Sequence, residues 1–169
     1  MLKGVGKFLI ALNGNASKSQ IAAGIAWGML LGLVPASNFF GIVLFIISFF
    51  FTHNHGAKIF SMAIIKIISP LIVLGIDFIG WEVLHIGALQ PVYTTLYNMP
   101  FVPFTNFNNT LVMGGLVSGI VLWLPVFLLF IFLIPLYRTH VASKIKEAKI
   151  VKKIASSPLL KLLDKVLFK

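Results

Sequence analysis

The chain has 169 residues, of which 59% are hydrophobic and 11% charged, with 14 Lys or Arg against 4 Asp or Glu. Soluble domains carry about 25% charged residues, whereas residues 20–57 and 90–137 here contain none. A chain this small cannot hide such stretches in one core, so an integral membrane protein is expected. Cysteine is absent, which excludes disulfides, c-type haem, iron–sulfur clusters and thiolate chemistry.

The N-terminal segment predicts an interfacial helix over residues 1–12, with Lys3 and Lys7 on its polar side. Its apolar run is too short for the hydrophobic region of a cleavable signal peptide, and Asn13 follows at once. The alternative is an N-terminus without a fixed structure. No lipid anchor is expected, because residue 2 is leucine and no cysteine is present to be acylated.

Three apolar blocks follow and predict an all-α fold. Residues 21–51, with Ser17 or Ser19 as a helix cap, contain Pro35 near the middle and predict a re-entrant helical hairpin. Residues 59–89 contain Ser69-Pro70 and predict a broken transmembrane helix, while residues 111–137 predict a plain one. Together with an outer loop over residues 90–110 they form a single membrane domain over residues 1–137, followed by a basic amphipathic tail over residues 138–169.

Lysine and arginine set the expected orientation. They are concentrated in the first eighteen residues and after Tyr137, and the 90–110 loop has none, so both termini are expected in the cytoplasm and that loop outside. Three single crossings would place one terminus on the wrong side, so one block must enter and leave on the same face. The first block is the better candidate because Pro35 divides it into two short arms. The alternative exchanges the roles of the first two blocks.

Small residues recur at every fourth position in the first block, at Gly24, Gly28 and Gly32. Such a stripe lets another helix approach to backbone distance. We expect it to pack the two arms of the hairpin against each other, with association between chains as the alternative.

The first two blocks resemble a bacterial membrane family catalogued as domain of unknown function 2062. The resemblance rests on Ile21-Ala22-Ala23-Gly24-Ile25-Ala26-Trp27-Gly28, Gly32, Val34-Pro35, Asn54 and Ser69-Pro70, and covers about residues 21–80. Ser69 stands where the family usually has asparagine, and the stretch after the proline is shorter. The resemblance implies a small inner-membrane protein with no assigned reaction.

Ionisable residues within an apolar block are functional candidates. Lys66 and Asp77 are three helical turns apart, and a break at Pro70 would bring them closer. We predict a substrate or lipid path formed by Lys66, Asp77, Pro35, Ser37, Asn38, Ser69 and Pro70. The alternative is that Lys66 reaches the cytoplasmic surface, while Glu82 and His85 lie in the outer interface beside Trp81.

No cofactor or metal is expected, because the His53-Asn54-His55 pair lacks a third ligand nearby. The aromatic, uncharged loop over residues 90–110 suits either the outer membrane surface or a periplasmic partner. The tail predicts lipid-surface helices, or else a solvated basic segment. The basic residues predicted to contact the membrane surface are Arg138, Lys144, Lys146, Lys149, Lys152 and Lys153. Nucleic acid is not expected as a partner, because aromatic residues do not alternate with the basic residues of the tail.

Catalytic motifs are absent, so we do not expect an enzyme. The sequence predicts a small subunit or module of the bacterial inner membrane that serves the transport of phospholipid or polyprenyl phosphate. Its expected partners are membrane lipids together with a larger envelope protein or further copies of the chain. The alternative is a structural anchor that has no substrate of its own.

Overall fold

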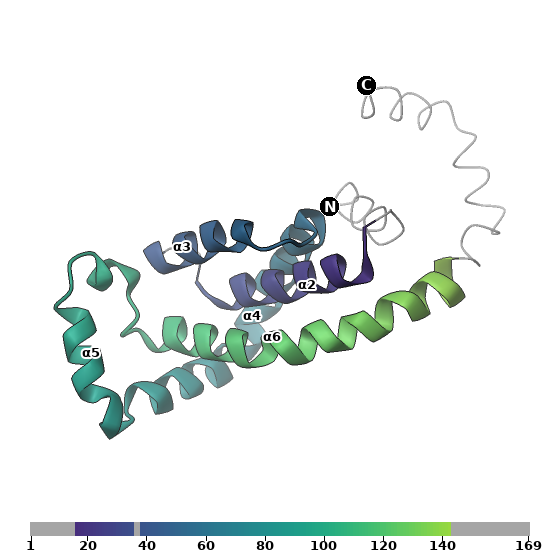
Figure 1. The fold of residues 1–169 in the computed structure, drawn as a ribbon. Helices are drawn as coiled ribbons and strands as arrows, with labels where there is room; N and C mark the ends of the chain where they lie inside the picture. The colour runs from purple at the N-terminus through teal and green to yellow at the C-terminus, as the bar shows by residue number, and fades with distance from the viewer. Residues whose placement is uncertain (1–15, 36–37, 143–169) are drawn as a thin grey trace. The chain divides into compact units, whose positions relative to one another are not determined.

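The computed structural model describes residues 16–35 and 38–142, and every element in this part of the chain is helical, as expected (Figure 1). Contacts divide the chain into two units, Met1–Ile131 and Phe132–Lys169, and the packing below concerns the first. The elements are α2 (Lys18–Leu33), α3 (Phe39–Ile47), η1 (Ser48–Phe50), α4 (His55–Leu84), η2 (Gly87–Leu89), α5 (Gln90–Tyr97), η3 (Val102–Thr105), α6 (Thr110–Leu136) and the π-helical η4 (Tyr137–Ala142).

Helix α2 begins and ends where its sequence dictates. Ser17 accepts a hydrogen bond from the Gln20 backbone at 3.2 Å, and the Gln20 side chain accepts one from the Ser17 backbone at 3.3 Å. This reciprocal capping box satisfies two of the free N–H groups at the helix start. At the other end, Val34 has an extended backbone because Pro35 follows it. The first apolar block is therefore divided at Pro35, as predicted.

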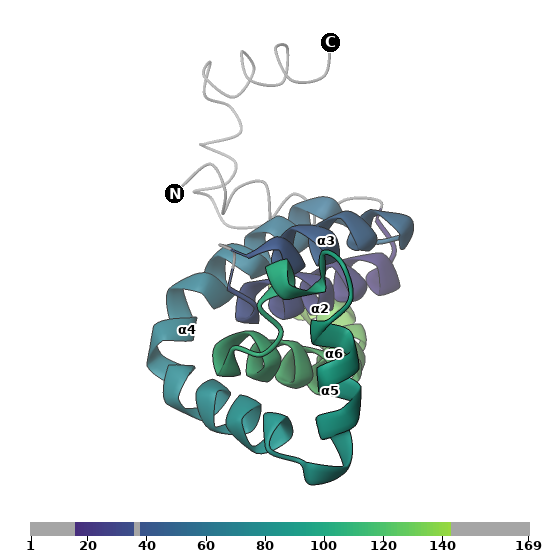
Figure 2. The same ribbon diagram turned by 90° about the vertical axis from the view of Figure 1, so that its left-hand side faces the viewer.

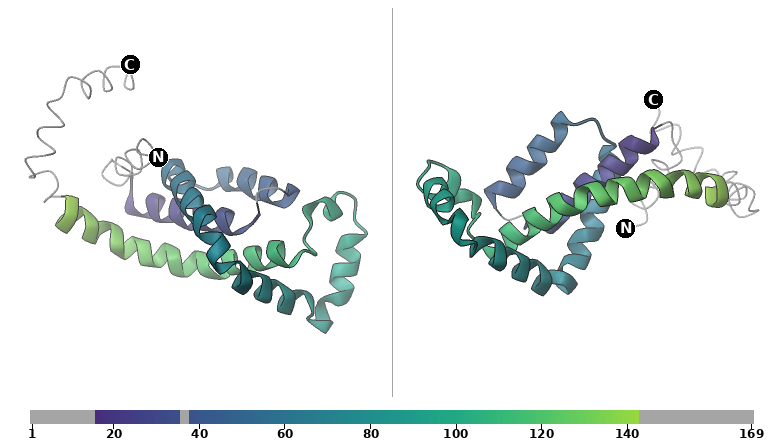
Figure 3. Two further views of the ribbon diagram at one scale, coloured as in Figure 1. Left: turned by 180° about the vertical axis from the view of Figure 1, so that it is seen from behind. Right: turned by 60° about the horizontal axis from the view of Figure 1, so that its bottom comes forward.

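The glycine stripe of α2 packs against α4. A methyl group added at Gly24, Gly28 or Gly32 would overlap Asn54 and Ala57, Lys58 and Ser61, or Ile65, respectively. The partner predicted for this stripe, the other arm of the hairpin, was wrong. The reason is that α4 runs beside α2 at backbone distance, where glycine is required, whereas α3 leaves the break on a separate course (Figure 3).

Two hydrogen bonds fix α2 and α4 side by side. The Asn54 N–H donates to the Gln20 carbonyl at 2.8 Å, and the Ser61 hydroxyl donates to the Ile25 carbonyl at 3.0 Å. Residues near the start of α2 therefore face residues near the start of α4, and the two helices run in the same direction. It follows that α3 and η1 return the chain to the level at which α2 began.

The second apolar block forms the continuous helix α4, so the expected break at Pro70 was wrong. Pro70 cannot donate to the Lys66 carbonyl one turn earlier, but the Ser69 hydroxyl donates to that carbonyl at 3.1 Å. This replacement bond keeps the helix intact through the proline. The helix bends near its middle, where Pro70 lies (Figure 2), as is usual for proline within a helix.

Helix α6 packs against α4 and α2 through small residues of its own. Gly114 contacts the Ile76 backbone, and Gly80 of α4 contacts the Thr110 backbone, so that neither position has space for a side chain. Gly115 and Gly119 lie in the same way against Leu33 and Leu30 of α2. A small apolar core of Met29, Leu33 and Ile76, with Ile65, Leu111 and Val126 around it, fills the junction.

Within the described chain, α4 and α6 are long and apolar enough to cross a membrane. Only 6% and 11% of their most apolar 18-residue stretches are buried, so they are unlike the core helices of a soluble protein. Leu71 and Leu74 of α4, for example, are 84% and 83% exposed. These helices place wide apolar faces on the outside of the protein.

The predicted outer loop contains helices. Segments η2, α5 and η3 connect the far end of α4 to the start of α6 (Figure 1). The Tyr93 hydroxyl donates to the Val83 carbonyl at 3.0 Å, and the rings of Tyr93 and Tyr97 lie 6.2 and 6.5 Å from that of Phe107. These contacts fold the loop back on itself and onto the end of α4.

Several predictions lie outside the described residues. They are the interfacial helix over residues 1–12, Ser37, and the tail lysines Lys144, Lys146, Lys149, Lys152 and Lys153. Arg138 lies within η4.

His53, in the connection between η1 and α4, is buried. Its Nδ1 donates to the Phe51 carbonyl at 2.7 Å, because a carbonyl oxygen can only accept, and its Nε2 has no partner among the described residues. Burial lowers the pKa of His53, and the neighbouring Lys58 and His55 lower it further, against the opposing effect of the Phe51 bond. The folded protein therefore favours neutral His53.

The packing of the glycine stripe predicts that the same substitution, glycine to alanine, affects stability very differently at two positions. Gly28→Ala forces a methyl group against the Lys58 carbonyl and Ser61, whereas Gly75→Ala on the same bundle meets nothing within 4 Å. We expect Gly28→Ala to lower the free energy of unfolding by about 1–3 kcal/mol. Gly75→Ala should leave it unchanged or raise it by less than about 1 kcal/mol. Unfolding of the purified protein by SDS measures both, and equal effects would contradict the packing.

Because the folded protein favours neutral His53, we expect the protein to lose stability in acid. Its folded-state pKa lies below the ordinary value of 6.5, so the unfolded chain takes up a proton first as the pH falls. Stability is therefore greatest above about pH 6.5 and declines as the pH falls through the lower, folded-state value. Thermal unfolding followed by circular dichroism between pH 8 and 5 should show this decline in the wild type and in His55→Gln. A decline of the same steepness in His53→Gln would contradict it.

Candidate functional site

Four of the predicted path residues line one cavity of about 350 Å³. Lys66, Ser69 and Pro70 come from α4, and Pro35 comes from the break after α2. The remaining walls are mainly apolar and include Leu33, Val73, Ile76 and Leu111. The structure therefore brings these four residues together, although the helix that carries three of them is continuous.

Among the described residues that line this cavity, Lys66 is the only ionisable one, and its amine donates a hydrogen bond to the Val34 carbonyl. That carbonyl belongs to the end of α2, where backbone acceptors lack helical partners and a cation is favourable. Lysine carries three N–H donors, so others are available to a ligand. A second apolar cavity of about 360 Å³, lined by Val34, Ile42, Phe45 and Met62, also contacts Lys66.

Asp77 lies elsewhere, and the structure does not bring it to Lys66. Its carboxylate accepts a hydrogen bond from the Thr110 hydroxyl at the start of α6. A carboxylate is favourable there because the N-terminus of a helix carries partial positive charge. Asp77 lines neither of the two cavities around Lys66. It joins α4 to the start of α6.

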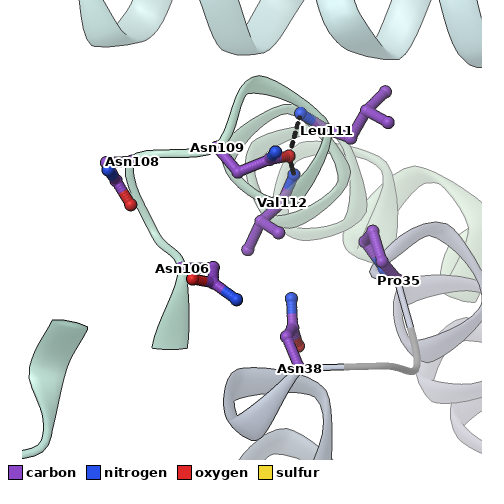
Figure 4. Close-up of a pocket in the computed structure, with 7 residues that line it drawn as sticks. All are labelled: Pro35, Asn38, Asn106, Asn108, Asn109, Leu111 and Val112. Atoms are coloured by element: carbon purple, nitrogen blue, oxygen red, sulfur yellow. Dashed lines mark hydrogen bonds between the residues drawn. The ribbon is translucent and has the colours of Figure 1, made fainter. Parts of the chain in front are cut away.

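A third cavity, of about 540 Å³, adjoins the break and is lined mainly by asparagine (Figure 4). Asn38 accepts a hydrogen bond from the Gly41 N–H at 2.7 Å and so caps α3. Asn109 accepts from the N–H groups of Leu111 and Val112 at 3.0 and 3.3 Å at the start of α6. Pro35 and Leu111 line both this asparagine pocket and the Lys66 cavity, so the two lie side by side.

The asparagines after the outer loop and Lys58 were not among the residues predicted from the sequence. Asn106, Asn108 and Asn109 line the pocket, and an asparagine group directly before an apolar block is a helix-start signal that could have indicated them. Lys58 is fully buried and donates to the Ser48 hydroxyl at 2.8 Å. Its amine also lies 3.9 Å from the centre of the Phe49 ring, a cation–π contact that fixes η1 against α4.

The arrangement suits an amphipathic, anionic ligand. One cationic amine lies at a helix break between cavities with apolar walls, and amide groups line the adjoining pocket. An amine with spare donors binds a phosphate or carboxylate, and the apolar walls suit a hydrocarbon chain. Binding and orientation are the chemistry that these groups supply.

No family model matches the chain, and no solved structure matches it, so the resemblance to domain of unknown function 2062 remains a prediction. A protein of Treponema pallidum (strain Nichols), described only as an uncharacterized protein, is 31% identical over 161 residues. The similarity covers 95% of this chain and 99% of the relative. Since the two share nearly their whole length at this identity, the chain belongs to the same family as the Treponema pallidum protein.

Proposed function

We propose that the protein is a small multi-pass protein of the bacterial inner membrane that serves lipid transport, with Lys66 binding an anionic headgroup. The lipid is a phospholipid or a polyprenyl phosphate. The observation that carries this proposal is the position of the Lys66 amine at the break after α2, between two cavities with apolar walls.

The exposed apolar faces of α4 and α6 support a location in the membrane. Helix α4 has 30 residues, which corresponds to about 45 Å and is enough to cross a hydrocarbon core of about 30 Å at a tilt. Helix α3 adds exposed apolar side chains, among them Ile42 and Ile46, each 54% exposed. Such surface is costly in water and favourable in lipid.

The parallel course of α2 and α4 supports a re-entrant hairpin. The Asn54–Gln20 hydrogen bond places the start of α4 at the level where α2 begins, so the chain enters and returns on one face. The break at Val34 lies at the level of Lys66, eleven residues or about 17 Å along α4 from His55. With α4 and α6 as the two crossings, both termini are on the cytoplasmic side and α5 is outside.

A cation at this depth favours an anionic ligand. Placing lysine near the bilayer centre costs about 2.5–3.5 kcal/mol on insertion scales. The Val34 carbonyl offsets part of this cost but carries no full charge. A lipid phosphate beside Lys66 would complete the neutralisation, while its chains occupy the apolar cavities and the bilayer.

The exposed face of α3 also suits a partner helix. The exposed residues are Phe39, Ile42 and Ile46 of α3, and Phe49 and Phe50 of η1, which follows it. We propose a larger envelope protein, or further copies of this chain, at this face. If the chain is instead a structural anchor without a substrate, this surface would be its main functional feature.

The topology is testable because the chain has no cysteine of its own. Single cysteines at the exposed positions Ser19, Thr52 and Asn98 are labelled with a membrane-impermeant maleimide in spheroplasts. We expect Asn98→Cys to react from outside, and Ser19→Cys and Thr52→Cys to react only after permeabilisation. Labelling of Thr52→Cys from outside, with Ser19→Cys protected, would show that the first block crosses the membrane.

The role of Lys66 is testable with Lys66→Gln, which keeps an N–H donor for Val34 and removes the charge. Lys18→Gln, at the exposed start of α2, is the matched control. We expect the wild type and Lys18→Gln to co-purify with anionic phospholipid, and Lys66→Gln to retain about tenfold less. A tenfold loss is about 1.4 kcal/mol, close to the lower end of the range of about 1.5–3 kcal/mol for one hydrogen bond to a charged group. Mass spectrometry of the lipids extracted with the protein measures the ratio.

An unchanged lipid ratio in Lys66→Gln would refute the headgroup site. Mass spectrometry of the proteins in the same gentle purification from native membranes separates the remaining functions. A stoichiometric envelope protein without bound lipid would establish the anchor role, whereas bound lipid that depends on Lys66 would establish the transport module.

A further inference from the structure

The Asn38 side chain is buried with its amino group unsatisfied. Asn38 is 6% exposed, and its Oδ1 accepts from the Gly41 N–H at 2.7 Å. Because an N–H can only donate, this bond fixes which end of the amide is oxygen, and the NH₂ group must point the other way. That Nδ2 atom has no hydrogen-bond partner in residues 16–35 and 38–142.

The free NH₂ group points into the asparagine pocket (Figure 4). The Asn106 side chain points toward it from the opposite side, and Asn108 and Asn109 complete the polar wall. A buried amide donor normally has an acceptor. Since this one faces a cavity of about 540 Å³, a ligand that carries acceptor atoms has room to bind it.

Two helices begin at this pocket, which sets the preferred charge of the ligand. Helix α3 starts directly after Asn38, and α6 starts directly after Asn109. The N-terminus of a helix carries partial positive charge and favours anions. None of the described residues that line the pocket is acidic or basic. Because the Asp77 carboxylate already accepts from Thr110 at the start of α6, the preference for an anion comes mainly from the start of α3.

We propose that the asparagine pocket binds the phosphate group of a phosphate ester, with the Asn38 NH₂ as a buried donor to a phosphate oxygen. This site is distinct from the Lys66 cavity, because its donors are amides and it lies beside the start of α6. The pocket volume exceeds that of a bare phosphate, so the ester group is accommodated as well. The ester is either a lipid headgroup or a water-soluble compound with the same group.

Titration calorimetry of the full-length protein in a neutral detergent, with glycerol 1-phosphate as the probe, tests the proposal. We expect saturable binding of glycerol 1-phosphate and none of glycerol. Asn38→Asp keeps the oxygen that caps α3 and replaces the donor by a carboxylate, so we expect it to weaken binding at least about tenfold.

Asn54→Asp is the matched control. Asn54 caps α4 through the Ala57 N–H at 2.8 Å, as Asn38 caps α3, but it does not line the pocket. We expect its affinity to equal that of the wild type. Asn38→Ser and Asn54→Ser form a second, uncharged pair, since serine also caps helices. This pair decides the result if the buried carboxylate of Asn38→Asp prevents folding.

The outcomes separate this site from Lys66 and identify the source of the ester. Binding of glycerol 1-phosphate that is lost in Lys66→Gln but kept in Asn38→Asp and Asn38→Ser would assign the probe to the Lys66 cavity and overturn the proposal. Added phosphatidylglycerol displaces the probe if the natural ligand is a lipid headgroup, and leaves it bound if the natural ligand is a soluble ester. Absence of saturable binding, or equal affinities in the Asn38 and Asn54 variants, would overturn the proposal.

Discussion

The arrangement depends on how backbone carbonyls are satisfied where proline interrupts apolar helices. Such groups are costly in surroundings without water unless the protein itself supplies partners. Lys66 connects the two interruptions: its amine bonds to the Val34 carbonyl before Pro35, and its own carbonyl accepts from the Ser69 hydroxyl beside Pro70. One residue thus joins the end of α2 to the bend of α4, and both cavities open beside it.

Local chemistry was predictable from the sequence, and the partners of each element were not. Residue types and spacing were enough to predict the Ser17 cap, the break at Pro35 and the long helix α6. A proline within an apolar run indicates a lost hydrogen bond, but whether a neighbouring hydroxyl replaces it depends on the rotamer of Ser69. In the same way, the spacing of Gly28 predicts a close approach without saying which helix makes it.

The candidate site shows the same division between local and long-range information. Lys66 and Asp77 were predicted together because ionisable residues within an apolar block are unusual, but Asp77 lines neither of the two cavities around Lys66. Lys66 bonds to the end of α2, and Asp77 bonds to the start of α6. Helical periodicity relates residues within one helix and cannot predict these contacts between helices. Asn38 and Asn106 are 68 positions apart and meet only because η3 returns to the break.

The parallel packing of α2 on α4 has a consequence for the order of assembly during synthesis. A ribosome completes α2 well before residues 57–65 of α4 have been synthesised. During that time the glycine stripe of α2 has no helix to pack against. Until then α2 is too short to cross a bilayer and presents bare backbone on one side. Helix α2 therefore reaches its final packing only after α4 has been made.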